Sequence, residues 1–361
     1  MEVAVVRCNG LRKAVQTHRA QDGGTSISDV FLMANGAEAM IHPAAARDEE
    51  PVRTKHNRLV SVGIPFHNNV ETIDIAIRSV FAQTYENWEL ILVDDGATDG
   101  SLPIARSVKD SRVRVISDGA NKGLACRLNQ IAGLANGDYI ARMDADDIMH
   151  PERLASQVEY LQANPCVDVV GSAVYTIDEN DAPTGVRSLR PLDFSLWAAL
   201  RHGLFVHPSV CGRAEWFRHN PYDDAFLGSE DRELWVRTLK TSSFAKLPRP
   251  LLFYRENDRA VRQYLKHYLK AGRYERRICR TYGPACVGWS QTAGLLTVSY
   301  LKCATYAIAA ALGVQGRLVG KRNRALSEIE KAAAVLALNI VAGASVPGLE
   351  SSKEIGASEW K

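Results

Sequence analysis

The sequence predicts an α/β fold, in which a mostly parallel sheet is flanked by helices and followed by a helical C-terminal region. Apolar runs of strand length alternate with segments of helical periodicity between residues 59 and 143. This alternation favours right-handed crossovers, which make neighbouring strands parallel. After about residue 256 the apolar positions recur at helical spacing, so we expect helices there.

The individual elements follow from the positions of these runs. Strands are predicted at 59–65, 88–93 and 112–116, and in the short run that begins at Tyr139. Pro65 stops the first strand, because proline cannot donate to a strand ladder. Helices are predicted at 73–80, 102–108 and 123–135.

Polar clusters follow three of the predicted strands. The first strand is followed by Pro65-Phe66-His67, the second by Asp94-Asp95-Gly96 and the last by Asp144-Ala145-Asp146. In open parallel sheets, ligands bind beyond the carboxyl ends of the strands. The three clusters should therefore share one edge of the sheet and form the ligand site.

The last cluster contains three carboxylates, Asp144, Asp146 and Asp147, within four positions. Carboxylates this close repel one another, so they need water, basic groups or a cation nearby. On a strand, Asp144 and Asp146 would point to the same side. They could then hold Mg²⁺ or Mn²⁺, which prefer oxygen ligands. The alternative is an acidic turn, with Asp146 or Asp147 as a helix N-cap near Pro151, but it does not explain the other polar strand ends.

Composition and absent motifs exclude several classes of protein. A net charge of +3 over 361 residues gives no argument for nucleic acid, and 46% hydrophobic residues are ordinary for a soluble protein. No Gly-x-Gly-x-x-Gly follows the first strand and no Walker loop is present, which argues against a dinucleotide or P-loop site. The seven cysteines have no Cys-x-x-Cys spacing, and their odd number without a signal peptide indicates a reducing, cytoplasmic setting.

A set of motifs stands in a characteristic order along residues 58–255. They are Val60-Ser-Val-Gly-Ile-Pro65, Ser79-Val-Phe-Ala-Gln-Thr-Tyr85, Trp88-Glu-Leu-Ile-Leu-Val-Asp-Asp-Gly96, Asn121-Lys-Gly123, Asn129, Gly137-Asp-Tyr-Ile140, Asp144-Ala-Asp-Asp147 and Pro151-Glu-Arg-Leu154. As a set they resemble the family 2 glycosyltransferases of bacterial polysaccharide biosynthesis. The resemblance implies the GT-A fold, an inverting mechanism, a nucleotide-diphosphate sugar donor and Mn²⁺ or Mg²⁺.

The resemblance also implies roles for single residues. Asp95 would accept a hydrogen bond from the nucleotide base, commonly uracil, and the Pro65 region would pack beside that base. Lys122 would meet a phosphate, or else be a solvated lysine in a turn. The metal set is Asp144 and Asp146, with Asp147 in support. The nucleotide-binding set is Pro65, His67, Asp94, Asp95, Lys122 and Asp144.

The second half of the chain supplies a candidate base. The segment around Glu230-Asp231 resembles the family's Glu-Asp pair before a helix, which makes Asp231 the candidate general base and Glu230 the first alternative. Without that resemblance, the pair reads as favourable charge at a helix N-terminus. His207 is either an acceptor or donor contact or a packed histidine. The Gln-x-x-Arg-Trp signature of processive synthases is absent, which indicates one sugar per encounter.

The two ends of the chain carry less information. Residues 1–57 read as a poorly ordered extension with a short helix near 30–40, and residues 351–361 as a polar tail. Within the helical region 256–350, the basic helix near 261–277 reads as lying on an anionic membrane or as docked on the domain. The apolar stretches 293–314 and 332–346 are not clean transmembrane signals and read as packed or peripheral helices.

The expected function is an inverting, metal-dependent, non-processive glycosyltransferase. It would act in the cytoplasm or at the inner face of the membrane, on a UDP-sugar donor and a glycan or lipid-linked acceptor. A sugar nucleotidyltransferase would instead need a glycine- and arginine-rich loop with a lysine where Phe66-His67-Asn68-Asn69 stands. A non-catalytic subunit of a polysaccharide assembly complex would be expected to lose Asp146 or Asp231, and both are present.

Overall fold

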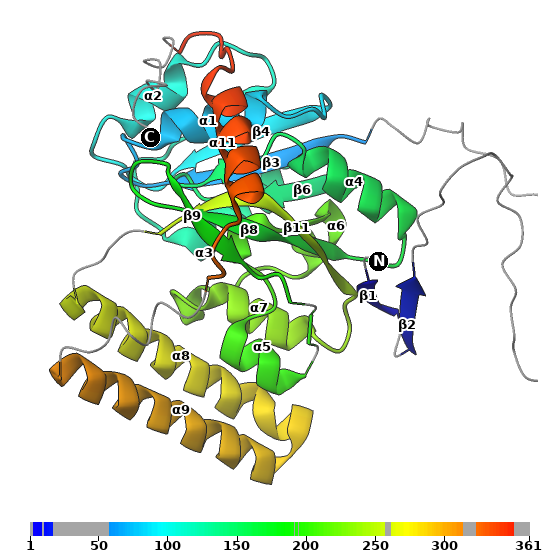
Figure 1. Ribbon diagram of the computed structural model, residues 1–361, viewed down its shortest axis with the longest axis vertical. Coiled ribbons are helices and arrows are strands. Elements are labelled where there is room, and N and C mark those ends of the chain that lie inside the picture. The colour runs from blue at the N-terminus through cyan, green and yellow to red at the C-terminus, as the bar shows by residue number, and fades with distance from the viewer. Residues whose placement is uncertain are drawn as a thin grey trace, which may run out of the picture.

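A nine-stranded sheet forms the centre of the molecule, in the order β5-β4-β3-β6-β10-β8-β11-β7 with β9 paired to β8 (Figure 1). The computed structural model describes residues 3–8, 11–16, 58–190, 192–193, 195–256, 261–312 and 323–349. The strands of this sheet are β3 (Val60–Phe66), β4 (Trp88–Asp94), β5 (Val113–Ile116), β6 (Tyr139–Arg142), β7 (Ile148–Met149), β8 (Val169–Ile177), β9 (Pro183–Arg187), β10 (Cys211–Arg213) and β11 (Phe244–Arg255).

Most of these strands run in one direction. Parallel pairs join β3 to β4 and β6, β4 to β5, and β8 to β11. Only β10 separates β6 from β8, and it is antiparallel to both, so β8 runs the same way as β6. The carboxyl ends of β3, β4, β6, β8 and β11 therefore lie along one edge, and the prediction of a mostly parallel sheet is confirmed.

Helices lie on both faces of this sheet. They are α1 (Ile73–Phe81), α2 (Ser101–Ser107), α3 (Leu124–Leu134), α4 (Arg153–Ala163), α5 (Leu196–His202), α6 (Ala214–His219), α7 (Glu230–Thr238), α8 (Val261–Val287), α9 (Trp289–Ala311) and α11 (Glu328–Ala342), with 3-10 turns η1 (His207–Ser209) and η2 (Asp224–Phe226). Helices α1, α2 and α4 share one buried apolar cluster with the sheet, and α3, α5, α6, α7 and α8 share another. The three helices predicted before residue 140 are confirmed as α1, α2 and α3.

The carboxyl ends of the parallel strands form the edge that we call the ligand edge. The end of β4 shows how the sequence places polar groups there. All seven residues of β4 are buried, as expected for a strand covered on both faces. At Gly96 the chain turns with a positive φ of 73°, and a Cβ there would lie 2.9 Å from the backbone nitrogen of Asn121. Glycine therefore permits the turn that leaves Asp94 and Asp95 at the edge.

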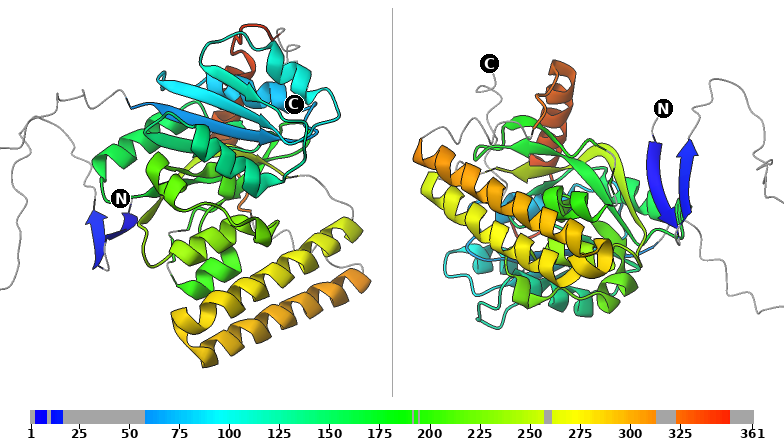
Figure 2. Two further views of the ribbon diagram at one scale, coloured as in Figure 1. Left: turned by 180° about the vertical axis from the view of Figure 1, so that it is seen from behind. Right: turned by 90° about the horizontal axis from the view of Figure 1, so that it is seen from below.

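The C-terminal region is helical, as predicted. Helices α8 and α9 form an antiparallel hairpin beside α5 and α7, and α11 lies on α1 at the far end of the molecule (Figures 1 and 2). The carbonyl of Ala344 accepts a hydrogen bond from Arg78 on α1 at 2.9 Å. By length and hydropathy, Trp289–Ala311 is the one helix among the described residues that could cross a membrane.

The N-terminal extension and the cysteines differ from expectation. Strands β1 (Val3–Cys8) and β2 (Leu11–Gln16) pair antiparallel within the segment expected to be poorly ordered. The helix expected near 30–40 and the polar tail 351–361 lie outside the described residues. Cys166 is disulfide-bonded, whereas Cys126, Cys211, Cys279, Cys286 and Cys303 are free thiols.

Candidate active site

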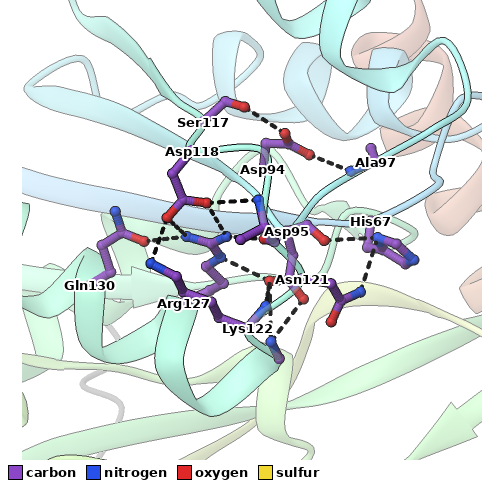
Figure 3. Close-up of polar contacts among 12 residues, drawn as sticks. His67, Asp94, Asp95, Ala97, Ser117, Asp118, Asn121, Lys122, Arg127 and Gln130 are labelled. Atoms are coloured by element: carbon purple, nitrogen blue, oxygen red, sulfur yellow. Dashed lines mark hydrogen bonds and ion pairs between the residues drawn. The ribbon is translucent and has the colours of Figure 1, made fainter.

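Asp95 holds together the group of predicted nucleotide-binding residues at the ends of β3 and β4, here called the nucleotide corner (Figure 3). Its Oδ1 accepts hydrogen bonds from the amides of Lys122 and Gly123, at 2.7 and 3.1 Å, and from Nε of Arg127 at 2.8 Å. Its Oδ2 accepts a second bond from the Gly123 amide at 3.1 Å. Asp95 therefore holds the 118–123 loop against the end of β4, whichever role it has toward a ligand.

Arg127 of α3 lies between two carboxylates in this corner. Its side chain is 1% exposed and pairs with Asp95, and its Nη2 is 2.7 Å from Oδ1 of Asp118. The ammonium of Lys122 also pairs with Asp118, at 2.7 Å. The Lys122 side chain, expected at a phosphate, is thus engaged by Asp118, while its backbone amide contacts Asp95.

The other predicted nucleotide residues surround Asp95. The Nδ1 atom of His67 lies 2.9 Å from the backbone carbonyl of Asp95. Asp94 accepts hydrogen bonds from the Ala97 amide at 2.8 Å and from the Ser117 hydroxyl at 2.7 Å (Figure 3). Pro65 is buried within β3, which continues to Phe66, so the prediction that Pro65 stops this strand is wrong. The structure brings these residues together, and Asp94 and Asp95 serve mainly protein donors there.

Residues 144–147 form a turn. Because β6 ends at Arg142, the expected strand alternation of Asp144 and Asp146 is wrong. The turn still gathers the acids, since carboxylate oxygens of Asp144, Asp146 and Asp147 lie within 4.8 Å of one another. The alternative of a helix cap is wrong as well, because the N-cap residue of α4 is Glu152.

The charges in this turn are incompletely compensated. Burial raises the pKa of Asp146, and Asp144 adds to that rise. Burial also raises the pKa of Asp147 well above its usual range, with further contributions from Asp144 and Asp146. The Oδ2 atom of Asp147 is buried without a hydrogen-bond partner in the part of the chain that the structure describes. A cation with a preference for oxygen ligands would relieve both conditions, so these residues fit Mg²⁺ or Mn²⁺.

Two arginines fix the acidic turn from opposite sides. Arg142, whose side chain is 3% exposed, holds both oxygens of Asp144, at 2.6 and 2.9 Å. Arg255 at the end of β11 donates from its amide to Asp147 Oδ1 at 3.0 Å and from Nε to the Asp146 carbonyl at 2.9 Å. Its guanidinium also binds the Asp181 carboxylate of the β8–β9 loop. Asp144 is thus paired with a cation, whereas Asp147 keeps one oxygen free of protein donors.

The start of α7 presents two acids with different surroundings. Glu230 is 6% exposed, and its Oε2 accepts a hydrogen bond from the Gly228 amide at 2.5 Å. Burial raises the pKa of Glu230, and the charge of Asp231 adds to this. Asp231 is half-buried, and its side chain has no hydrogen bond or ion pair to any other described residue. Of the two, Asp231 is the carboxylate left available to a ligand.

Tyr222 is a buried tyrosine on which the charges of both the acidic turn and the start of α7 act. Its hydroxyl lies 2.9 Å from Nε2 of His207, and burial raises its pKa while lowering that of His207. Arg142 acts electrostatically on both rings, and the charges of Asp231, Glu230 and Asp144 act on Tyr222. His207, expected as an acceptor or donor contact, thus makes its described polar contact with Tyr222.

The backbone of Tyr222 is itself clamped by α3. The side chain of Asn129 donates to the Tyr222 carbonyl and accepts from its amide, both at 2.8 Å. The neighbouring loop also meets the nucleotide corner, since Leu227 lies 3.6 Å from the position that a Cβ on Gly123 would take. The 222–227 segment therefore lies against α3 and its N-cap residue Gly123.

Sequence reasoning missed several residues that build this site. Arg142 had a local signal, because it lies only two positions before Asp144, the acid that it pairs with. Arg127 binds Asp95, which lies 32 residues earlier in the chain, and Tyr222 contacts His207, which lies 15 residues earlier. Arg255 binds Asp147 across 108 residues. No spacing in the sequence marks those pairings.

A cleft of about 450 Å³ lies at the opposite edge of the sheet, near the start of β6. Its lining includes Arg58, Tyr139, Arg213 and Trp216, and none of the predicted site residues. The polar groups that match the expected chemistry all lie at the other ends of the strands.

Comparison with known proteins agrees with this geometry. The family model described as Glycosyl transferase family 2 matches residues 61–219. Glycosyltransferase EpsE of Bacillus subtilis is 42% identical over 136 residues, which cover 37% of this chain and 48% of EpsE. The Escherichia coli protein named UDP-Glc:alpha-D-GlcNAc-diphosphoundecaprenol beta-1,3-glucosyltransferase WfgD is 30% identical over 190 residues, which cover 52% of this chain and 73% of WfgD.

The chain belongs to glycosyl transferase family 2. This confirms the expected class of enzyme, a glycosyltransferase, and with the sheet topology it confirms the expected fold class. The match to EpsE spans about half of that protein, so the activity of a whole relative does not transfer directly. A structure of Staphylococcus aureus TarS 1-349 with UDP aligns at a TM-score of 0.49 and 14% identity, covering 79% of this chain and 80% of that one. A likeness of that size carries no argument about ligands.

Proposed function

We propose that the chain is an inverting, metal-dependent glycosyltransferase that adds one sugar per encounter. The donor is a nucleotide-diphosphate sugar, specifically a UDP-sugar, and the acceptor is a hydroxyl of a glycan or a lipid-linked glycan. The observation that carries the proposal is that the site contains two acidic groups, one with carboxylates close enough to hold a metal ion and one at the start of a helix. One is the 144–147 turn, and the other is the Glu230-Asp231 pair.

The two acidic groups suit different tasks. In the turn, Asp146 and Asp147 have raised pKa values, and Asp147 has an oxygen without a protein donor. Such a group favours a cation with bound phosphate. The Asp231 side chain carries neither an ion pair nor a hydrogen bond among the described residues, so it can accept a proton from a bound hydroxyl.

In the proposed reaction, the acceptor hydroxyl attacks the anomeric carbon as Asp231 takes its proton, and the nucleoside diphosphate leaves from the opposite side. This single displacement inverts the anomeric configuration and needs no covalent sugar–enzyme intermediate. Asp144, Asp146 and Asp147 would hold the divalent metal, which supplies Lewis-acid stabilisation of the departing diphosphate when bound. Glu230 holds the loop before α7 through the Gly228 amide, which keeps Asp231 in place.

The choice of donor and acceptor rests on a relative. WfgD, whose name gives UDP-Glc as donor and a diphosphoundecaprenol-linked sugar as acceptor, matches more than half of this chain. In the nucleotide corner, Asp95, His67 and the Pro65 region would lie beside the nucleotide base. The small net charge gives no argument for a nucleic-acid partner. We therefore propose a UDP-sugar, a lipid-linked acceptor and a cytoplasmic site of action.

Calorimetric titration tests the proposal. UDP-glucose, UDP-N-acetylglucosamine and GDP-mannose are titrated with and without Mn²⁺, into the wild type and into Asp146→Asn. We expect one UDP-sugar to bind more tightly with Mn²⁺, and Asp146→Asn to lose that gain. Asp110→Asn, an acid in the loop before β5, is the matched control. If no nucleotide sugar binds, or if Asp146→Asn responds to Mn²⁺ like the wild type, the proposal is wrong.

A further inference from the structure

Helix α9 of the α8–α9 hairpin buries hydroxyl-bearing side chains and exposes large apolar ones. On α9, Thr292 and Ser299 are buried, at 2% and 3% exposure. Leu301 and Ile308 face away from the molecule at 62% and 61% exposure, and Leu312 just after the helix is 70% exposed. A helix that faces water normally has the opposite arrangement, with leucine and isoleucine inside.

Close packing against α8 explains the inward face. A Cβ on Gly272 would lie 2.5 Å from Sγ of Cys303, and one on Gly283 would lie 2.7 Å from Oγ1 of Thr292. The two helices approach so closely that glycine on α8 and small or hydroxyl side chains on α9 fit between them. The large apolar side chains are thereby left on the outer face.

The outer face of α9 carries no charge along its length of about 35 Å. Its exposed positions between 290 and 312 hold Ser, Gln, Ala, Gly, Thr, Tyr, Leu and Ile. The hydroxyls of Thr297 and Thr305 are bonded within the helix, to the carbonyls of Ala293 and Leu301, each at 2.9 Å. Those hydroxyls therefore need no water, which suits an apolar surrounding.

The rim of this face is basic. Described residues 269–312 contain six Lys and Arg side chains and one acid, Glu275. Arg280 donates to the Tyr300 hydroxyl at 2.9 Å, and the guanidinium carbon of Arg276 lies 4.4 Å from the centre of the Tyr300 ring. These contacts place two guanidinium groups beside the apolar face, where they would meet anionic headgroups.

The hairpin is connected by a short segment to the end of β11, which lies at the ligand edge. Only residues 256–260 separate the end of β11 from α8, a chain reach of at most about 20 Å. Because α9 runs antiparallel to α8, its last turns, with Ile308, return to the same end (Figures 1 and 2). The C-terminal end of α9 therefore lies at the same end of the hairpin as the start of α8, the helix that follows β11 in the chain (Figure 1).

We propose that the outer face of α9, rimmed by basic residues of α8, lies on the surface of a phospholipid bilayer that contains anionic lipid. The basic segment 261–277 is part of α8, and α8 packs on α5 and α7 with Ile278 buried in their shared apolar cluster. Helix α8 is the docked helix, and α9 makes the contact with lipid. Such a contact would hold the site beside acceptors anchored in the same bilayer, and the binding itself requires no sugar transfer.

Vesicle flotation of the full chain tests this assignment. Vesicles of phosphatidylcholine mixed with phosphatidylglycerol are compared with vesicles of phosphatidylcholine alone, for the wild type and for the double variant Leu301→Glu, Ile308→Glu. The control is Leu336→Glu, Ile340→Glu on α11, which changes residues exposed by 63% and 50% on a different helix. Circular dichroism and thermal melts establish that each variant is folded.

The wild type and the α11 variant should float with the anionic vesicles, with weaker binding as salt is added. The α9 variant should lose binding by about tenfold or more, because two carboxylates would have to enter the headgroup region. Arg276→Gln with Arg280→Gln should weaken binding to anionic vesicles and leave the weak binding to neutral vesicles unchanged. The proposal fails if the wild type floats with neither vesicle or if the α9 variant floats like the wild type. It also fails if sedimentation shows a wild-type dimer that the α9 variant dissociates while neither binds vesicles.

Discussion

Removing the carboxylate of Asp95 should destabilise the fold strongly, because the buried Arg127 then keeps only the exposed Asp118 as a carboxylate partner. The Arg127 side chain is 1% exposed and that of Asp95 is 11% exposed, and the two are 2.8 Å apart. Removing one partner of a buried ion pair typically costs about 3–5 kcal/mol. The amides of Lys122 and Gly123 would lose their acceptor in the same variant.

Urea denaturation measures this effect. With a slope of about 3 kcal/mol per M, the expected loss moves the unfolding midpoint of Asp95→Ala down by about 1–2 M. Asp118→Ala removes the exposed partner of the same arginine and should have a much smaller effect. The double variant Asp95→Ala, Arg127→Met should be more stable than Asp95→Ala alone, because it removes the buried guanidinium that has lost its buried carboxylate partner. A midpoint for Asp95→Ala near that of the wild type, or a double variant no better than the single one, would refute this reasoning.

Two further predictions concern the acidic turn and acid stability. Arg255→Met should raise the Mn²⁺ concentration needed for half-maximal binding of UDP by about 10–100-fold, as typical for residues that orient metal ligands; unchanged Mn²⁺ dependence in calorimetry would exclude this role. Burial lowers the pKa of His150 to about 4, so the unfolded state binds its proton at higher pH than the native state. The free energy of unfolding should therefore fall as the pH drops from about 6.5 to about 4. Protonation of His150 should account for up to about 3 kcal/mol of this loss. His150→Gln should flatten that part of the curve of unfolding free energy against pH, and an unchanged slope would contradict the assignment.

The strand ends could be predicted because the signals are local. The run 88–93 is apolar and is followed at once by two acids and a glycine, so both β4 and the position of Asp95 follow from the sequence. The same reasoning failed at the acidic cluster. An apolar run does not say where pairing stops, and β6 stops at Arg142, before the acids.

The partners of the site residues could not be predicted because they come from distant parts of the chain. Asp95 meets Arg127 across 32 residues, and Asp147 meets the Arg255 amide across 108. Either arginine could equally be a solvated surface residue on sequence grounds. The outward face of α9 was hidden for a related reason, since hydropathy gives the apolar content of a helix but not the side on which a neighbour packs.

The central claim is that Asp231 is the general base of a glycosyl transfer, and one comparison tests it directly. Donor binding by calorimetry and sugar transfer are measured side by side for the wild type, Asp231→Asn and Glu230→Gln, using the UDP-sugar that the titration identifies. Asp231→Asn should bind donor and Mn²⁺ like the wild type, while turnover falls by about 10²–10⁴-fold. Glu230→Gln should lose less, because Glu230 acts through the loop amide of Gly228. Turnover of Asp231→Asn within a few-fold of the wild type would contradict the account, and collapse in Glu230→Gln alone would place the base there.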